Sequence, residues 1–411
     1  MKIFTILSII GFSFNLFATE ELFQPIQYGV DQDLEMNMKG MKANVTDDLI
    51  PIDKIHVKIF PHDGKYTAPA RAELRTDQVK IKSEGTCILT YLNDETKNIE
   101  LTEAVVKAED FTSDFGHLQC DKPLTIIREG AQAITYRGSF NFYNNEGKLL
   151  IVNNVTLRQY LKGVIPAEVY PSWPLETLKA QAVAARTYAL YQVREARRKK
   201  KNKQYDIDDT VMYQAYLGTN REHPSTSKAV EETENISLTD DEGKDIIAYF
   251  SADSGGYTET AINVWQGSDL SYTPSKPEVY DLTLVKSEWS VDFSLAEIEA
   301  RLLKRKIISQ DFKLAQFEIA KYTISGRIKK VILTSLDGRQ LNVHGESFRY
   351  GLSLRSSLFI INQSDDGRFH LDGRGHGHGV GMNQFGAKVL AKEMGWDFKQ
   401  ILSFYYEGVN I

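Results

Sequence analysis

The sequence predicts an α+β fold: a mixed, β-rich main domain with a few helices around a cleft, preceded by a smaller β-rich N-terminal module. Apolar residues alternate along many short segments that turn residues separate, which predicts strands. One long segment instead carries apolar residues at helical spacing, and no regular strand–helix–strand repeat follows it. The 411 residues allow more than one domain, and a net charge of −6 gives no basic field for nucleic acid.

The first residues have the composition of a signal peptide over 1–18. A lysine at position 2 precedes an apolar run over 3–17, and Ala18 offers a small residue for cleavage. The run is short for a membrane span of ~20 residues. We therefore expect export to the periplasm or cell wall, with no membrane span after cleavage. A polar, loosely ordered segment is expected over 19–48.

The N-terminal module is expected over 49–128, where HVKIF, QVKIK and CILTYL have strand patterns. Cys87 and Cys120 both fall in this module, and in an oxidising compartment we expect them to form a disulfide. The strand pattern continues through AITYRGSFNFYNNEGKLLIVNNV, in which NNEG predicts a hairpin turn. The main domain is expected over 129–411.

The strongest helix prediction covers SWPLETLKAQAVAARTYALYQVREARRKK. Ser172 is a candidate N-cap, Pro174 falls in the first turn, and an alanine-rich stripe predicts close packing against another element. The basic run Arg194–Lys203 suits a helix C-terminus; such a run is typical of a solvated face but would also attract an anionic polymer. Beyond it, strands alternate with turns, and further helices are expected around 294–306 and 384–394.

A proline-rich stretch, IPAEVYPSWP, holds the first candidate for chemistry. Glu168 lies between Pro166 and Pro171, just before the predicted helix, in what we expect to be a stiff loop. Tyr170 and Trp173 are its apolar neighbours in the sequence. Apolar surroundings raise the pKa of a carboxyl group, which suits a proton donor to a glycosidic oxygen. Most glutamates on loops are simply solvated, and that interpretation stays open at this point.

The glycine-rich stretch RGHGHGVGMNQFGA near the C-terminus allows several interpretations. It lacks the lysine of a phosphate loop and the acidic residue of a dinucleotide site. His376 and His378 would point to one side of a strand and so permit a metal, but His370 is the nearest further histidine and no cysteine is close. The glycines favour a backbone that approaches a ligand closely, with His378 as a polar contact.

Two further stretches add candidates for a cleft. In AYFSADSGGYTE a strand runs into Ser254 and Gly255; no motif supplies the partners that would make Ser254 a nucleophile, so we expect a tight turn. MYQAYLG predicts a strand or turn with Gln214 and Tyr216 on one side. An amide and an aromatic ring on one side suit sugar recognition and equally suit a packed core.

Taken in their order along the chain, the four stretches and the helix resemble the stage II sporulation protein D family, from about residue 134 to the C-terminus. The resemblance implies an exported lytic transglycosylase acting on peptidoglycan glycan strands, with no cofactor, and with 129–411 as its catalytic domain. Glu168, in the family's P-x-E motif, would protonate the oxygen between N-acetylmuramic acid and N-acetylglucosamine, and the muramic C6 hydroxyl would close on C1. The cleft residues expected to bind substrate are Arg186, Gln214, Tyr216, Ser254, Gly255, His378 and Gln384.

The chain departs from this family at two places. His376 stands where many members have a tryptophan, which alters a surface for stacking on sugars. Where some members hold zinc, this chain has Asp208, Met212 and Tyr213, and we predict no metal. Two other functions stay open: a non-catalytic glycan-binding regulator of a cell-wall amidase, and a hydrolase that holds a metal with His376 and His378.

Overall fold

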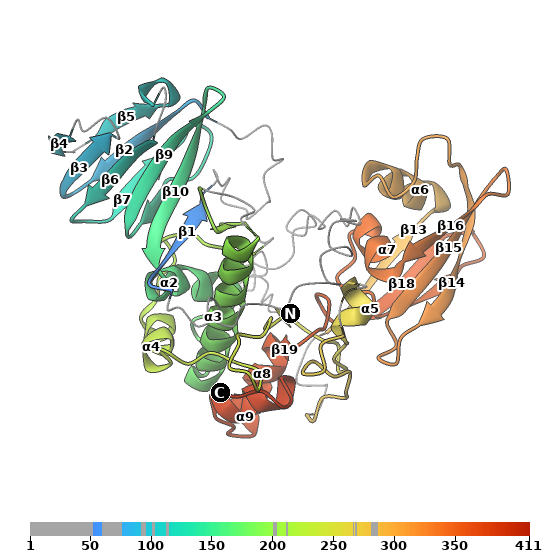
Figure 1. Cartoon of the computed structure of the whole chain (residues 1–411). Helices are drawn as coiled ribbons and strands as arrows, with labels where there is room; N and C mark the ends of the chain where they lie inside the picture. The colour runs from blue at the N-terminus through green and yellow to red at the C-terminus, as the bar shows by residue number, and fades with distance from the viewer. Residues whose placement is uncertain are drawn as a thin grey trace, which may run out of the picture.

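A computed structural model describes residues 52–59, 76–91, 96–100, 103–111, 115–199, 204–210, 213–265, 267, 269–280 and 287–411. The predicted signal peptide, the segment 19–48 and Met212 lie outside these residues. The molecule has the shape of a V, with a β-rich lobe at each tip and helices at the base (Figure 1). The predicted α+β, β-rich class is confirmed, because helices and several separate sheets are both present.

Two sheets that share one apolar core make up the first lobe. Its strands are β1 (Lys54–Lys58), β2 (Gln78–Ser83), β3 (Thr86–Tyr91), β4 (Thr96–Glu100), β5 (Ala104–Lys107), β6 (Phe115–Cys120), β7 (Leu124–Ile127), β8 (Ile134–Tyr136), β9 (Ser139–Asn145), β10 (Lys148–Thr156) and β11 (Ile207–Asp208). The sheet orders are β11-β1-β10-β9-β6-β3-β4 and β5-β2-β7-β8. The expected module boundary at residue 128 therefore falls inside this lobe, because β8, β9 and β10 pair with strands on the other side of it.

A disulfide and a tight hairpin turn stabilise this lobe. Cys87 and Cys120 form a disulfide between the paired strands β3 and β6. The predicted hairpin turn is confirmed between β9 and β10, where Glu146 and Gly147 have φ values of 56° and 78°. Two consecutive positive φ values are the signature of a type I′ turn, which matches the twist of the flanking strands.

A helix that the sequence did not predict, α2 (Leu157–Glu168), follows β10 directly. Thr156 caps it, accepting a hydrogen bond from the Gln159 N–H. The predicted stiff loop around Glu168 is wrong: Glu168 is the last residue of this helix, and Pro166 lies inside it. Proline in the last turn removes one helical N–H, and the helix still closes through the Val169 N–H and the Ile165 carbonyl at 3.0 Å.

The long predicted helix is present as α3 (Leu175–Arg198). It begins three residues after the expected N-cap Ser172, with Pro174 in the capping position instead. Its alanines pack on two sides: Ala182 and Ala185 belong to the core of the first lobe, whereas neighbouring residues join the helices at the base. The predicted close packing of the alanine stripe is confirmed, and α3 connects the first lobe to the base (Figure 1).

The second lobe forms within 287–374 and has an apolar core of its own. Its elements are β13 (Glu288–Phe293), α6 (Leu295–Lys304), β14 (Leu314–Tyr322), β15 (Ile328–Ser335), β16 (Gln340–His344), α7 (Gly345–Leu352), β17 (Phe359–Gln363) and β18 (Phe369–Arg374). They form two sheets, β13-β18-β17 and β14-β15-β16. The predicted helix around 294–306 is confirmed as α6, which Ser294 caps together with Glu297.

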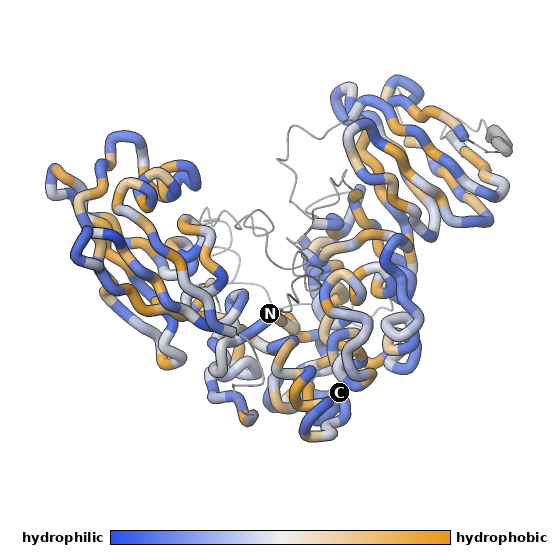
Figure 2. The backbone as a smooth tube through the Cα atoms, turned by 180° about the vertical axis from the view of Figure 1, so that it is seen from behind, coloured by the Kyte–Doolittle hydropathy of each residue, from blue (hydrophilic) through white to orange (hydrophobic). Residues whose placement is uncertain are grey.

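The base combines segments from before and after the second lobe. It contains α4 (Pro224–Glu232), α5 (Ala261–Trp265), α8 (Gln384–Glu393) and α9 (Phe398–Tyr405), and a short parallel pair of β12 (Phe250–Ser251) with β19 (Met382–Asn383). The predicted last helix is confirmed as α8. Apolar and polar residues alternate along the strands of both lobes (Figure 2). Within the described ranges, no helix has the length and apolar character to cross a membrane.

Candidate functional site

Glu168, the last residue of α2, is the ionisable group best suited to proton transfer. Its side chain is partly buried, and its Oε1 accepts a hydrogen bond from the Ala215 N–H at 3.3 Å. Burial raises the pKa of this carboxyl to about 7, while the Ala215 N–H opposes that rise. Near neutral pH both protonation states are therefore populated, which an acid that later acts as a base requires.

Segment 213–218 approaches α2 closely enough to hold the Ala215 N–H in place. A Cβ at Gly163 would lie 2.5 Å from the Gly218 carbonyl oxygen, so only glycine permits this contact. Gln214 connects two helices: its Oε1 accepts from the Tyr160 hydroxyl at 3.3 Å, and its Nε2 donates to the Ala185 carbonyl at 3.1 Å. The backbone next to Glu168 is therefore tied to both α2 and α3.

Gln214 and Tyr216 both lie in the core beside Tyr160. The tilted rings of Tyr216 and Tyr160 are in contact with their centres 4.9 Å apart, and the Tyr216 hydroxyl donates to the Asn153 Oδ1 at 2.9 Å. Each of the two residues is 1% exposed. The residue between them, Ala215, contacts Glu168, but the Gln214 and Tyr216 side chains are buried rather than at the surface.

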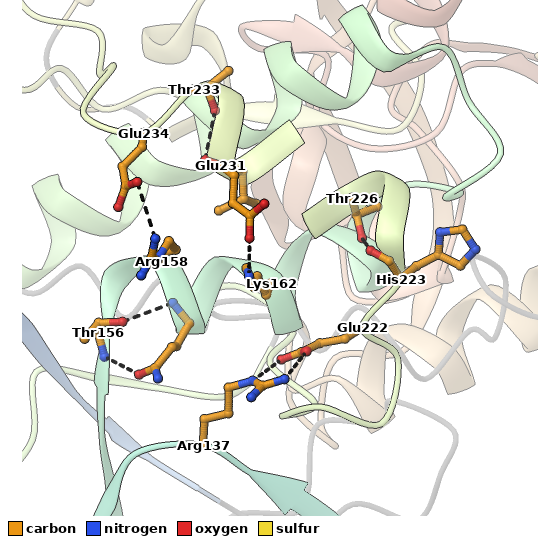
Figure 3. Close-up of polar contacts among 12 residues, drawn as sticks. Arg137, Thr156, Arg158, Lys162, Glu222, His223, Thr226, Glu231, Thr233 and Glu234 are labelled. Atoms are coloured by element: carbon orange, nitrogen blue, oxygen red, sulfur yellow. Dashed lines mark hydrogen bonds and ion pairs between the residues drawn. The ribbon is translucent and has the colours of Figure 1, made fainter. Parts of the chain in front are cut away.

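Helix α4 packs along α2 and is joined to it by ion pairs (Figure 3). Lys162 of α2 contacts Glu231 at 2.6 Å, and Arg158 contacts Glu234 at 3.5 Å. The N-terminal end of α4 also reaches the segment after Glu168, because the Ser225 hydroxyl donates to the Pro171 carbonyl at 2.6 Å. Helix α4 thus braces both the helix that ends at Glu168 and the segment that follows it.

Arg186 holds the other end of α4. Its guanidinium donates to the carbonyl oxygens of Val230 and Ile236, at 3.1 Å and 3.0 Å, and to the Thr233 hydroxyl. The residue is 5% exposed. Burial lowers its pKa to about 10, so it keeps its charge at neutral pH. The structure places Arg186 in contact with the end of α4, where it satisfies carbonyl groups that the helix leaves without a partner.

Ser254, Gly255 and Gln384 belong to a second polar cluster, at the start of α8. The Ser254 hydroxyl donates to Glu278 at 2.8 Å and accepts from the Asn383 amide at 3.0 Å. Gly255 has a φ of 76°, and Gln384 donates to the Gln181 side chain at 3.3 Å. Ser254 is 0% exposed and Gln384 is 4% exposed. These residues fix the turn and the start of α8.

His378 and His376 in the glycine-rich segment are both partly buried neutral imidazoles. The His378 Nδ1 accepts the Val380 N–H at 2.9 Å, and burial lowers the pKa of this ring to about 3. Burial also lowers the pKa of His376 to about 4, with a further contribution from the positive charges of Arg349 and Arg355. Within the described part of the chain, no group of three or more His, Cys, Asp and Glu side chains is placed to hold a metal ion.

Aromatic residues that the sequence analysis did not select lie between Glu168 and His378. Tyr188 of α3 interacts electrostatically with Glu168, and its ring centre lies 6.2 Å from that of Tyr249. Tyr249 stacks on Trp265 at 4.2 Å, and Trp265 meets the His378 ring at 4.8 Å. Tyr188, Tyr249 and Trp265 come from distant segments, so no local pattern identifies them. Their only signal in the sequence is that each falls in or near a stretch with a predicted helix or cleft residue.

Known proteins resemble most of the chain. A family model described as "Stage II sporulation protein" matches residues 145–239, which include Glu168 and Arg186. A second model, "Domain of unknown function (DUF8618)", matches 283–381, which covers the second lobe and both histidines of the glycine-rich segment.

Three relatives each match between 61% and 68% of this chain. An uncharacterised protein of Brachyspira hyodysenteriae is 36% identical, over 68% of this chain and 72% of its own length. The stage II sporulation protein D of Bacillus amyloliquefaciens is 31% identical, over 63% of this chain and 75% of its own length. The amidase enhancer of Bacillus subtilis is 31% identical over 61% of this chain, but the match spans only 40% of that protein.

Proposed function

The chain belongs to the stage II sporulation protein D family, and on that premise we propose that it is an exported lytic transglycosylase of peptidoglycan glycan strands. The observation that carries the proposal is the Glu168 carboxyl group, with a pKa raised to about 7 at the end of a braced helix. The names of its relatives, a sporulation protein and an amidase enhancer, support a role at the cell wall.

The proposed reaction uses Glu168 first as an acid and then as a base. The protonated carboxyl donates its proton to the oxygen between N-acetylmuramic acid and N-acetylglucosamine, and the bond from that oxygen to the muramic C1 breaks. The muramic O6 then bonds to C1 while its hydroxyl proton passes to the Glu168 carboxylate. The products are a 1,6-anhydro end and a free C4 hydroxyl, the acid is regenerated, and no water is consumed.

The neighbours of Glu168 tune this single carboxyl group. Burial favours the protonated form that starts the reaction, and the Ala215 N–H stabilises the carboxylate that exists between the two proton transfers. We assign Gln214, Tyr216 and Arg186 to supporting this geometry, because all three are buried and bonded to protein groups. Ser254, Gly255 and Gln384 support the turn before α8, and His378 stays a candidate for substrate contact because it is partly exposed.

The proposal is tested by digesting sacculi, both intact and amidase-treated, with the wild-type protein and with Glu168→Gln. Glutamine keeps the shape of the side chain but has no acidic proton. We therefore expect the rate of release of 1,6-anhydro products to fall by at least about 10³-fold, which is within the range expected when a general acid is removed. Products are identified by mass spectrometry. Glu242→Gln removes the same charge from a 73% exposed side chain and should leave the rate unchanged. Equal product release by wild type and Glu168→Gln, or none from either, contradicts the proposal.

A second candidate function rests on the relative named amidase enhancer: a glycan-binding protein that regulates a cell-wall amidase without cleaving the glycan. To separate the two, stem-peptide release by a purified amidase is measured with wild type and Glu168→Gln added. Equal stimulation by both proteins, without any anhydro product, supports the regulator. Anhydro products that disappear in Glu168→Gln support the transglycosylase.

A further inference from the structure

We propose that Tyr188, Tyr249, Trp265 and His378, called here the aromatic row, form a subsite that binds an N-acetylated amino sugar of the glycan strand beside the bond at Glu168. The inference rests on the proposed function, because the glycan strand is the proposed substrate. It adds residues and a binding mode to that function, since three of the four side chains are not among the predicted cleft residues.

Each ring of the aromatic row contacts the next one, from Tyr188 to His378. Tyr249 and Trp265 are stacked with ring planes 24° apart, and His378 meets Trp265 edge-on at 61°. Tyr188 extends the row from Tyr249 toward Glu168, with which it interacts electrostatically. A glycan that reaches the carboxyl group can therefore lie across rings that are already in contact with one another.

Partial exposure distinguishes the aromatic row from the aromatic core. Tyr160, Tyr216, Tyr405 and Tyr406 are fully buried, as expected for rings that only pack the interior. All four members of the row instead keep part of their surface open to solvent. Large rings that are held in place but incompletely covered are typical of ligand-binding surfaces, since water leaves them when a ligand binds.

The row is chemically matched to a neutral sugar. Burial raises the pKa values of the Tyr188 and Tyr249 phenols, so both keep their hydroxyl hydrogens, and the lowered pKa of His378 keeps this ring uncharged. A pyranose ring offers an apolar face of C–H groups and a rim of hydroxyl and N-acetyl groups. Its face can stack on an aromatic ring while its rim exchanges hydrogen bonds with phenol groups.

Two members of the row, Trp265 and His378, are held in place by protein contacts before any ligand arrives. His378 is held by the Val380 N–H and by a hydrogen bond with the backbone of Phe250. Trp265 packs against the buried cluster of Ala261, Val264 and Val380. Because these rings are already ordered, a sugar that stacks on them costs little additional side-chain entropy.

The test measures binding in the Glu168→Gln background, where cleavage does not remove the ligand. The probes are stem-peptide-free glycan strands and a soluble N-acetylglucosamine oligomer. We expect Trp265→Ala to weaken binding of both about tenfold or more, as loss of one aromatic stacking contact predicts. Trp265→Phe should stay within about threefold, because a smaller ring still stacks. Trp396→Ala is the matched control, since Trp396 is also partly buried but packs against Phe404 at the base.

A fluorescence readout tests contact rather than folding. Binding of the oligomer should change the tryptophan emission of the Glu168→Gln protein. Adding Trp265→Phe should abolish this emission change while the affinity is kept. Adding Trp396→Phe should keep both the emission change and the affinity. Unchanged affinity in Trp265→Ala, an emission change that persists in Trp265→Phe, or no binding in the Glu168→Gln background overturns the inference. A different result contradicts the proposed function alone: the wild-type protein releases no anhydro product even though Trp265→Ala weakens binding.

Discussion

A carboxyl group on the last turn of a helix normally lies in water, and Glu168 differs because its surroundings are built from segments far away in the sequence. The Ala215 N–H of segment 213–218 contacts the carboxyl, and the buried Tyr160 phenol interacts with it electrostatically. Desolvation penalises the charged form, and one backbone hydrogen bond compensates only in part. The sequence motif identifies Glu168, whereas its elevated pKa is a property of the folded chain.

The raised pKa of Glu168 predicts a pH dependence at the level of one residue. In the free protein the acid must be protonated, so kcat/KM for glycan cleavage should be constant below the pKa and fall about tenfold per pH unit above about pH 7. With the ordinary carboxyl value of 4.5, the fall would begin more than two units lower. A profile measured from pH 4 to 9 on soluble stem-free strands distinguishes the two; a decline that begins near pH 5 contradicts the assignment.

At the residue scale, the sequence indicated some neighbours of Glu168 and missed others. Gln214 and Tyr216 lie next to Glu168 but are buried, because the amide and the phenol find protein partners in Tyr160 and Asn153. The aromatic row was not predicted, since its members share no sequence spacing and meet only after α3, the segment before β12, α5 and the glycine-rich segment have come together.

At the scale of elements, the junction of α2 with segment 213–218 determines where Glu168 lies. Gly163 is the contact point, and an added Cβ would lie 2.5 Å from the Gly218 oxygen and 2.8 Å from the Tyr216 ring. The Gly218 backbone and the buried Tyr216 ring cannot both make room for this Cβ unless α2 moves. The element that carries the catalytic candidate is therefore positioned by a residue without a side chain.

Gly163→Ala should consequently lower the cleavage rate by at least tenfold and destabilise the protein by about 1–3 kcal/mol, the range of an overpacked core. Product release and urea denaturation measure the two effects. Gly267→Ala is the control, because among the described residues its Cβ would have only the Trp265 carbonyl oxygen within 4 Å, at 3.8 Å. Wild-type stability and rate in Gly163→Ala would show that α2 does not need this close approach.

Helices with strong local signals were predicted and the others were not. The segments of α3, α6 and α8 have helical periodicity or a cap that can be identified directly in the sequence. Helix α2 was missed because Gly163 and Pro166 are ordinarily helix breakers, and its stability comes from packing against α3 and α4. In α2, the helix that carries Glu168, tertiary contacts therefore outweigh the low helix propensity of the local sequence.

For the whole molecule, a buried guanidinium contributes to the junction between the second lobe and the base. Arg327, at the start of the lobe's central hairpin, donates to the Ser254 and Tyr257 carbonyl oxygens at 2.6 Å and 3.0 Å. It is 1% exposed, and its guanidinium occupies the space where a side chain at Gly379 would lie. Arg327 therefore connects the lobe, the Ser254 turn and the glycine-rich segment that carries His378.

Arg327→Met should destabilise the protein by roughly 3–5 kcal/mol, because it leaves carbonyl groups and the nearby Glu259 carboxylate buried without their positive partner. Thermal unfolding measures this loss, and glycan binding in the Glu168→Gln background should weaken as the His378 segment loses its support. Arg339→Met removes a cation with the same side-chain stem from the surface of the lobe, where Arg339 is 47% exposed, and should cost less than about 1 kcal/mol. Equal stability of the two variants would contradict the role of Arg327.

By itself, the sequence determined the α+β class, the main amphipathic helices, the hairpin after β9 and the family, and it indicated Glu168 as the catalytic candidate, because short-range patterns encode each of these. Only the tertiary structure decided the pKa of Glu168, the burial of Arg186, Gln214 and Ser254, the separate core of the second lobe and the assembly of the aromatic row. The physical reason is the same in every case: desolvation and ring contacts depend on which distant segments exclude water together. Ala215 and Glu168, which are 47 positions apart, meet only in the folded chain.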